Sequence, residues 1–323
     1  MAFIDVFNGD ADGLCALLQL RLATPVNSTL VTGVKRDISL LQRVHAGTGD
    51  QVTVLDISLE KNRLHLQRLL GHGAHIRYFD HHYAGKIPSH PHLQTHIDPA
   101  PDRGTSLLVD TWLQGRYRTW AVVGTFGDNF DQAAKQAASM LQVDQTVVSK
   151  LRDLGLYLNY NSYGATVDDL LIPPARLFRT LQTYPDPIVF IDQDPAYKRL
   201  QEGYQEDMHL AGNLQPETAD PRRAVYILPA ERWARRVSGV LANKLAREAP
   251  ERAHALLTRL PDGGFLVSVR APLIHPDGAD TLCRQFATGG GRKAAAGINH
   301  LPGEQFDTFV AAFVAAYDRT WTA

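Results

Sequence analysis

The amino-terminal part of the chain alternates between short apolar runs and longer amphipathic stretches. Short apolar runs predict strands, whereas apolar residues at three- and four-residue spacing predict helices. Strands that alternate with helices in this way form a parallel sheet with helices on both faces. The expected strands are 3–7, 29–34, 51–55 and 75–79, and the expected helices are 13–23, 37–46 and 60–71.

The rest of the chain predicts more helices and then a second, smaller domain. Residues 104–113 and 119–129 are expected to be buried helices of the first domain. A polar, proline-containing region follows, and the strand pattern then returns. We therefore expect an α/β chain with a first domain at 1–183, a linker region at 184–222 and a smaller α/β domain at 223–323. In the last domain we expect strands 223–228, 254–260 and 264–270, helices 232–248 and 280–286, and a hairpin turn at 261–264.

Composition and charge narrow the class of protein. The chain has 323 residues, of which 44% are hydrophobic and 21% are charged, and its formal net charge is -1. A polyanionic partner would therefore have to be held by a local patch of cations. Cys15 and Cys283 show no metal-binding spacing and are typical of a reducing compartment. No stretch reaches the roughly 18 apolar residues of a membrane-spanning helix, so we expect a cytoplasmic protein.

Three of the predicted strands end in carboxylates or imidazoles. Asp10 and Asp12 follow the first strand, Asp56 follows the third, and the tripeptide 80–82, Asp-His-His in sequence, follows the fourth. The carboxyl ends of parallel strands meet at one edge of a sheet, where ligands bind. Gathering these charges costs several kcal/mol unless cations are present. Oxygen ligands with one or two imidazoles favour Mn²⁺, Mg²⁺ or Zn²⁺.

Each of these residues has a simpler interpretation when it is taken singly. A lone Asp after a strand, such as Asp56, is usually a helix cap or a turn former. A lone histidine such as His82 is more often a surface residue than a metal ligand. The combination of three strand ends, rather than any one residue, favours a metal site.

The same residues resemble the motifs of a known family. The run 10–13, Asp56, the tripeptide 80–82 and Asp128 resemble motifs one to four of the DHH phosphoesterase superfamily. That superfamily includes RecJ-type exonucleases, nanoRNases that also act on 3′-phosphoadenosine 5′-phosphate, cyclic dinucleotide hydrolases and family II pyrophosphatases. The glycine-rich run 289–297 resembles the glycine-rich loop of the DHH-associated carboxyl-terminal domain. The resemblance thus covers nearly the whole chain.

The resemblance implies two divalent ions, Mn²⁺ or Mg²⁺, in the first domain. The first ion would be held by Asp10, Asp56 and Asp128. The second would be held by Asp12, His81 and the same two aspartates, Asp56 and Asp128. Two ions bridged in this way share a water or hydroxide that acts as the nucleophile. The resemblance therefore implies that the catalytic residues are Asp56, His81, His82 and Asp128. His82 would not be a ligand, and would either support the ligands from behind or face a phosphate.

Two positions depart from the family pattern. Val6 stands where many members have a histidine, and Arg292 stands where relatives commonly have a histidine after the glycines. An arginine retains phosphate binding because it offers a planar fork of donors and a permanent charge. The resemblance implies that the substrate lies in a cleft between the domains. Its neighbouring phosphate or terminal nucleotide would be held there by Arg270, the Gly290 and Gly291 amides and Arg292.

Residues 103–106 occupy the position of a small-residue motif near the active site of the family. Thr105 and Ser106 fit that motif and fit ordinary helix caps equally well. Their role stays open at the level of the sequence.

The resemblance implies a metal-dependent phosphodiesterase or phosphatase, and more specifically an exonuclease. Its expected substrates are terminal phosphoester bonds of short single-stranded oligonucleotides or small nucleotides, because the chain has no room for an added oligonucleotide-binding barrel. An exopolyphosphatase is an alternative, since polyphosphate needs the same metals and cations but no base pocket. A degenerate, non-catalytic nucleotide-binding relative is a second alternative. No membrane partner is expected, and the oligomeric state is not predicted.

Overall fold

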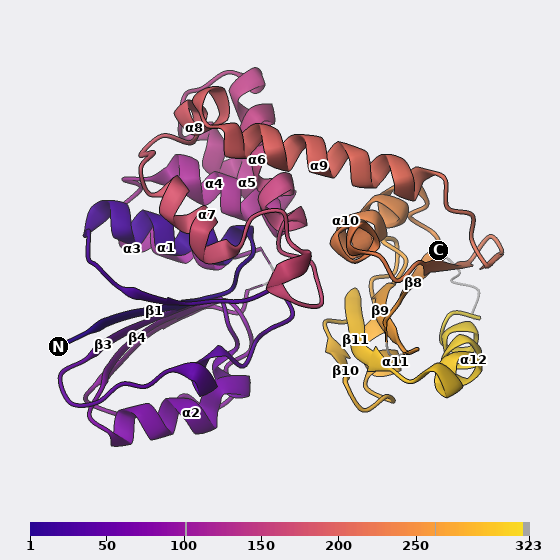
Figure 1. The fold of residues 1–323 in the computed structure, drawn as a ribbon, viewed down its shortest axis with the longest axis horizontal. Coiled ribbons are helices and arrows are strands. Elements are labelled where there is room, and N and C mark those ends of the chain that lie inside the picture. Colours follow the sequence, from indigo (N-terminus) through magenta and orange to yellow (C-terminus); the bar gives the residue numbers. More distant parts are fainter. Residues whose placement is uncertain (101, 262, 319–323) are drawn as a thin grey trace. The chain divides into compact units, whose positions relative to one another are not determined.

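The computed structural model describes residues 1–100, 102–261 and 263–318, which form two compact units (Figure 1). Unit 1 is Met1–Glu202 and unit 2 is Gly203–Ala323, so the boundary falls inside helix α9 (Pro195–Gly212). The region expected to link the domains, 184–222, holds α9 together with helix α8 (Pro187–Gln193) and the short strand β6 (Thr218–Ala219).

Unit 1 contains a five-stranded sheet in the order β2-β1-β3-β4-β5, and every neighbouring pair is parallel. The predicted parallel sheet is therefore confirmed. The order reverses direction between β1 and β3, and ligands of such sheets bind at the carboxyl ends of the strands on either side of that reversal. The strands are β1 (Phe3–Phe7), β2 (Thr29–Val31), β3 (Gln51–Leu55), β4 (His75–Asp80) and β5 (Leu93–Ile97).

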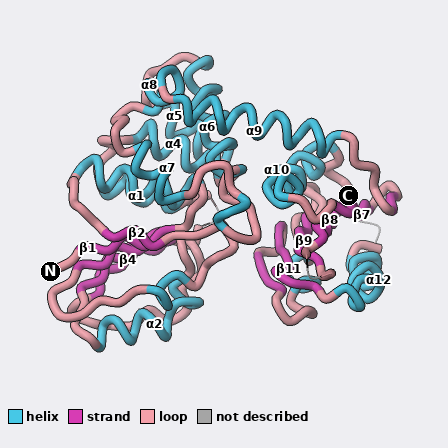
Figure 2. The backbone as a smooth tube through the Cα atoms, viewed as in Figure 1, coloured by secondary structure: helices cyan, strands magenta, loops and turns pink. Residues whose placement is uncertain are grey.

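Helices cover both faces of this sheet, and the strands lie between them in Figure 2. Helix α2 (Leu59–Gly71) covers one face, where Ile4 and Val6 of β1 join its core cluster. Helix α1 (Ala11–Ala23) and helix α3 (Thr105–Trp112) cover the other. Helix α1 is buried on all sides, because it is sandwiched between the sheet and a further helical layer. That layer contains α4 (Arg118–Gly127), α5 (Asp131–Ser139), α6 (Gln145–Tyr160), η2 (Val167–Asp169) and α7 (Pro174–Leu181).

The prediction of a helix at 37–46 is wrong, because only the short 3₁₀ helix η1 (Leu40–Arg43) forms there. The buried side chain of Asn62 in α2 replaces the missing helical hydrogen bonds. Its amide donates to the Ile38 carbonyl at 2.7 Å, and its oxygen accepts from the Leu41 amide at 3.1 Å. A tertiary contact therefore overrides the helical pattern of this segment.

Unit 2 contains a mixed six-stranded sheet in the order β10-β11-β9-β8-β7-β6. Strands β8 and β9 pair antiparallel, as expected, although residue 262 of the predicted turn lies outside the described residues. Phe309 and Phe313 anchor its apolar core. Its remaining elements are β7 (Arg223–Leu228), α10 (Arg232–Glu248), β8 (Ala253–Arg259), β9 (Phe265–Arg270), α11 (Ala279–Cys283), β10 (Gly289–Gly291), β11 (Ala295–Leu301), η3 (Gly303–Gln305) and α12 (Phe306–Ala316).

The glycine-rich run 289–297 holds a strand, a tight turn and the start of a second strand rather than a loop throughout. Gly289, Gly290 and Gly291 form β10, which pairs antiparallel with β11. Gly291 has φ of 140°, and a Cβ there would lie 2.5 Å from the Ala296 Cα. Only glycine tolerates both this conformation and this close approach. The tight turn that follows is closed by the Arg292 amide, which donates to the Ala295 carbonyl at 2.9 Å.

None of the helices in the described part of the chain combines the length and the apolar character needed to cross a membrane.

Candidate metal centre

The carboxyl ends of β1, β3 and β4 are neighbours in the sheet, and each delivers a buried aspartate. Asp10 caps α1 after β1, Asp56 follows β3, and Asp80 ends β4. All three have exposed fractions of 2% or less. The sheet therefore brings together the strand-end carboxylates that the sequence singled out.

Asp56 adopts a left-handed backbone conformation with φ of 59°. A non-glycine residue in this region stores strain, which the surrounding structure must hold in place. Here the Asp56 amide donates to the Phe79 carbonyl of the neighbouring strand at 3.0 Å. The strained turn directs the Asp56 side chain toward His81 instead of continuing the strand.

The amino terminus of α3 binds Asp12 and Asp56. The amides of Thr105 and Ser106 donate to the two oxygens of Asp12 at 2.6 and 2.9 Å. The Thr105 hydroxyl donates to Asp56 Oδ1 at 3.0 Å, and the Ser106 hydroxyl donates to Asp12. A helix amino terminus favours such negative charge. Gly104 is the N-cap of α3, and no side chain caps this helix. The Thr105 and Ser106 hydroxyls instead bind Asp56 and Asp12, so the interpretation of these two residues as helix caps is wrong.

His81 presents a lone pair to two carboxylates. Its Nδ1 lies 2.8 Å from the Arg103 carbonyl oxygen, which can only accept, so Nδ1 donates. In the neutral ring Nε2 then carries the lone pair, and it lies 3.4 Å from Asp56 Oδ1 and 3.7 Å from Asp128 Oδ2. In this form Nε2 and the two carboxylates are three potential ligand atoms that face one position. This arrangement is that of a metal ligand whose other ring nitrogen is held by a carbonyl.

Two groups of residues in the described chain offer ligand atoms within 4.8 Å of one another. One is Asp12, His81 and Asp128, and the other is Asp56, His81 and His82. His81 belongs to both groups, whereas Asp10 belongs to neither. Carboxylate and imidazole ligands of this kind fit Mn²⁺ or Mg²⁺.

His82 is oriented by Asp80. Its Nδ1 lies 2.7 Å from Asp80 Oδ1, and the ring packs edge-on against His81. Burial lowers the pKa of His82, but the hydrogen bond and charge of Asp80 raise it more, so the net shift is upward. Asp80 therefore supports His82, whose imidazole remains partly exposed.

Burial and mutual repulsion raise the pKa of the central carboxylates. The pKa of Asp56 lies well above its usual range because burial disfavours its charge, and Asp10 and Asp12 add repulsion. The pKa of Asp12 is also raised, mainly by burial. Such shifts mean that the site favours a bound cation over bare carboxylates.

Lys35 lies within this cluster, and the sequence did not single it out. Its Nζ donates to Asp10 Oδ2, to Asp128 Oδ1 at 3.0 Å and to Asn159 Oδ1 at 3.1 Å. Burial lowers the pKa of Lys35, but Asp10 and Asp128 raise it more, so it lies well above its usual value. Lys35 follows β2, a strand with no acidic motif at its end. Its place in the site is therefore seen only from its contacts with Asp10 and Asp128 in the structure.

Val6 contributes no ligand. It is fully buried in the core cluster on the α2 face of the sheet. The nearby Asn8 uses its side chain to shape the turn, since its oxygen accepts from the Asp10 amide at 3.2 Å and its amide donates to the Lys35 carbonyl at 3.2 Å.

The predicted phosphate-binding residues lie together in unit 2. Arg270 ends β9, where its Nε donates to Asn243 Oδ1 at 2.7 Å. Arg270 pairs in register with Ala295 of β11, and β11 in turn pairs with the glycines of β10. Arg292 is exposed at the turn between β10 and β11. One end of this sheet thus carries two arginines, Arg270 on the third strand and Arg292 at the turn that follows the glycines of β10.

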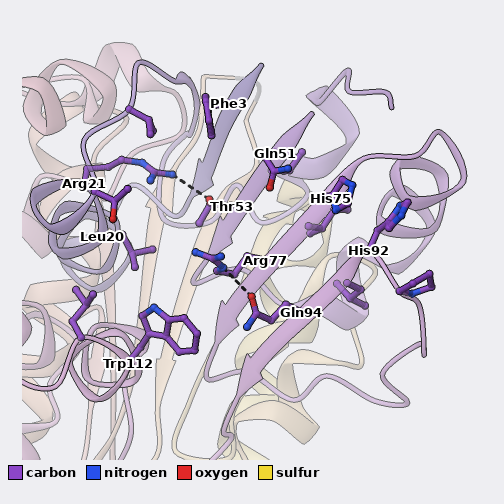
Figure 3. Close-up of a pocket in the computed structure, with 17 residues that line it drawn as sticks. Phe3, Leu20, Arg21, Gln51, Thr53, His75, Arg77, His92, Gln94 and Trp112 are labelled. Atoms are coloured by element: carbon purple, nitrogen blue, oxygen red, sulfur yellow. Dashed lines mark hydrogen bonds between the residues drawn. The ribbon is translucent and has the colours of Figure 1, made fainter. Parts of the chain in front are cut away.

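A cavity of about 460 Å³ lies elsewhere in unit 1 (Figure 3). Its strand residues come from the amino-terminal halves of β1, β3, β4 and β5, whereas the acidic cluster lies at the carboxyl ends. In Figure 3, Arg21 bonds to Thr53 and Arg77 bonds to Gln94 across its wall. None of the predicted ligands lines this cavity. The candidate metal centre is therefore located by the chemistry of the acidic cluster and not by this cavity.

Comparisons with known proteins give structural matches without sequence matches. No protein-family profile and no curated protein sequence matches the chain. A crystal structure of the exonuclease RecJ bound to manganese matches with a TM-score of 0.66 and 19% identity, covering 99% of this chain and 91% of that one. RecJ in complex with Mn²⁺ from Thermus thermophilus matches with a TM-score of 0.69 and 18% identity, covering 99% of this chain and about half, 52%, of that one.

A third structure is a small phosphodiesterase. The pGpG-specific phosphodiesterase PggH from Vibrio cholerae matches with a TM-score of 0.54 and 14% identity, covering 98% of this chain and 99% of that one. RecJ and PggH are both DHH superfamily members, and the matches extend over both units of the chain. The chain therefore has the fold of the DHH phosphoesterase superfamily, in agreement with its motifs from Asp10 to Asp128.

Proposed function

We propose that this chain is a divalent-metal-dependent phosphoesterase that hydrolyses terminal phosphoester bonds in short single-stranded oligonucleotides or small nucleotides. The observation that carries the proposal is the lone pair of His81, which faces Asp56 and Asp128 at 3.4 and 3.7 Å. Nε2 of His81 and these two carboxylates converge on one position that a cation can occupy. The fold, shared with manganese-bound structures of RecJ, supports the same conclusion.

The residues around His81 fit a divalent ion. We propose that Asp12, Asp56, His81 and Asp128 hold it. Asp12 and Asp128 share one ligand group with His81, and Asp56 shares the other group with His81. When bound, such an ion supplies charge stabilisation at the phosphate and activates water. Hydrogen bonds from Thr105, Ser106 and the Arg103 carbonyl keep the ligands in place without adding ligands.

His82 has a separate role in this proposal. Because Asp80 holds its Nδ1, its Nε2 is free to face a substrate oxygen. The raised pKa of His82 favours a protonated ring, which can hydrogen-bond a phosphate or protonate a leaving oxygen. Cleavage of a phosphodiester needs such a proton donor for its leaving alkoxide.

We propose a nucleotide rather than polyphosphate as the substrate, with Arg270, the Gly290 and Gly291 amides and Arg292 binding its phosphate. Exposed arginine next to glycine backbone is a suitable anion site. Proteins of the same fold include an exonuclease and a pGpG-specific phosphodiesterase, which supports a nucleotide.

The test compares substrates side by side in the presence of Mn²⁺. The purified chain is incubated with pGpG, a short single-stranded RNA, 3′-phosphoadenosine 5′-phosphate and polyphosphate, and the released products are quantified. We expect turnover of at least one nucleotide substrate and its loss when a chelator removes the metal. Turnover of polyphosphate alone would support an exopolyphosphatase. Binding of nucleotides without any turnover would instead support a non-catalytic module.

A further inference from the structure

The ammonium group of Lys35 has a complete set of partners within the acidic cluster. Its three N–H groups meet three acceptors, which are the oxygens of Asp10, Asp128 and Asn159. The side chain is largely buried, with 22% exposure, and its Nζ lies 5.9 Å from the centre of the Tyr163 ring. A fully bonded, buried ammonium is a fixed positive charge of the site.

The backbone of Lys35 is anchored independently of its side chain. Its amide donates to the Ser162 carbonyl at 2.9 Å, and its carbonyl accepts from the Asn8 side chain at 3.2 Å. These contacts link Lys35 to the loop after α6 on one side and to the turn after β1 on the other. The ammonium is thus placed by the fold and does not depend on the acidic residues alone.

The residues that Lys35 binds include two of the three residues that the family resemblance implies for the first ion. Asp10 gives one oxygen to the ammonium and the other to the Gly13 amide at 3.0 Å. Asp10 also belongs to neither group of ligands that close around His81. Val6, where many relatives have histidine, is buried in the apolar core. This side of the cluster therefore lacks ligands available to an ion, whereas the His81 side has them.

We propose that the ammonium of Lys35 permanently takes the place of one of the two expected ions, so that the chain binds a single divalent ion on the His81 side. This inference rests on the proposed function. The single ion is held by Asp12, Asp56, His81 and Asp128. Lys35 compensates Asp10 and shares Asp128, and a second divalent ion beside a fixed ammonium would meet like-charge repulsion.

The test measures Mn²⁺ stoichiometry on the full-length chain, with metal analysis after gel filtration and electron paramagnetic resonance spectroscopy. For the wild type we expect one Mn²⁺ per chain and the six-line spectrum of an isolated ion. Lys35→Met keeps the length of the side chain and removes its charge. We expect this variant to bind two Mn²⁺ per chain with an exchange-coupled spectrum, because Asp10 and Asp128 are released.

Two further variants make the result interpretable. Lys35→Gln is a second neutral replacement in case Lys35→Met does not fold, as judged by circular dichroism, and it has the same expected stoichiometry. Lys198→Met removes an exposed lysine of α9 and is expected to bind one Mn²⁺ like the wild type. These measurements require no turnover, so they report on Lys35 separately from catalysis.

Two Mn²⁺ with exchange coupling in the wild type would overturn the inference while leaving the proposed function intact. A folded Lys35→Met or Lys35→Gln variant that still binds one Mn²⁺ would also overturn it. The ammonium of Lys35 would then not occupy the position of a second ion. A wild type that binds no divalent ion and hydrolyses no phosphoester would overturn the proposed function, and the inference with it.

Discussion

At the scale of single residues, the site is a balance between buried negative charges and fixed donors. Four aspartates, Asp10, Asp12, Asp56 and Asp128, share a small space with the ammonium of Lys35 and the imidazole of His81. The donors that stabilise these carboxylates come from backbone amides and hydroxyls of α3 as well as from Lys35. Such an arrangement leaves residual negative charge that attracts a divalent ion.

Asp56 allows a test of this balance without loss of backbone geometry. Asparagine tolerates the left-handed conformation and has almost the same shape, so Asp56→Asn removes charge alone. We expect kcat with Mn²⁺ to fall by about 100-fold or more, since loss of groups that only support a ligand costs about 10- to 100-fold. Asp153→Asn, an exposed change on α6, is the matched control and should retain activity. Unchanged turnover in Asp56→Asn would refute a ligand role for this residue.

We predict that the stability of unit 2 depends on pH through His254 of β8. Burial and the nearby Arg252 lower the pKa of His254 to about 4. Because the unfolded chain takes up the proton near its ordinary pKa of about 6.5, it binds more protons than the folded chain between these two pKa values. The contribution of His254 to the free energy of unfolding is therefore fully present above a pH of about 6.5. It is lost as the pH decreases toward about 4.

The measurement is urea unfolding at a pH of about 7.5 and at a pH of about 5.5, on either side of the ordinary histidine pKa. We expect the free energy of unfolding of the wild type to fall by about 1 kcal/mol more than that of His254→Gln. His209→Gln, an exposed change in α9, should retain the wild-type slope. Equal slopes in wild type and His254→Gln would show that His254 is not responsible.

At the scale of elements, helix ends rather than helix bodies carry the chemistry. Asp10 caps α1, the first amides of α3 bind Asp12, and Asp128 ends α4. The first turn of α1 also lies very close to the turn after β1. A Cβ added at Gly13 would be 2.3 Å from the Asn8 carbonyl oxygen. Glycine at this point of the motif is therefore a packing requirement.

Gly13→Ala tests that requirement. We expect a loss of about 1–3 kcal/mol in the free energy of unfolding, because the clash is with backbone and cannot be relieved by a side-chain rotation. Gly71→Ala at the end of α2 is the control, since a Cβ there has no atom within 4 Å. It should be neutral or slightly stabilising, given the higher helix propensity of alanine. Chemical denaturation of both variants measures the difference.

Up to α4, most elements of unit 1 could be predicted from periodicity, and the two exceptions, β5 and the segment 37–46, have tertiary causes. The polar strand β5 was not predicted, because its pairing with β4 has no strong apolar signal in Leu93–Ile97. The helix predicted at 37–46 was displaced by hydrogen bonds from Asn62. In unit 2 the glycines of β10 carry no strand propensity, and only pairing with β11 makes them a strand.

At the scale of the whole molecule, the acidic cluster belongs to unit 1, whereas Arg270 and Arg292 belong to unit 2. We therefore propose that metal binding and phosphate recognition can be altered separately. Each unit has its own sheet and its own core, so a surface change in unit 2 should leave the acidic cluster unaffected.

Arg292→Gln tests this separation. We expect KM for a nucleotide substrate to rise by about 10-fold, the loss of one charge-assisted hydrogen bond, while Mn²⁺ affinity is unchanged. Arg284→Gln removes another exposed arginine, on the turn after α11, and should leave KM as in the wild type. If Arg292→Gln weakened Mn²⁺ binding as much as substrate binding, the two functions would not be separable.

The sequence by itself determined the alternation of strands and helices in unit 1 and the acids and imidazoles at the strand ends. Both are local properties, since strand periodicity and the polar residue after a strand can be read within a few positions. Only the tertiary structure decided which groups surround those acids. Lys35 meets Asp128 across 93 positions of sequence, and Ser106 meets Asp12 across 94. Such contacts depend on how the helices pack on the sheet. A pattern within a few positions of the chain therefore does not predict which residues meet.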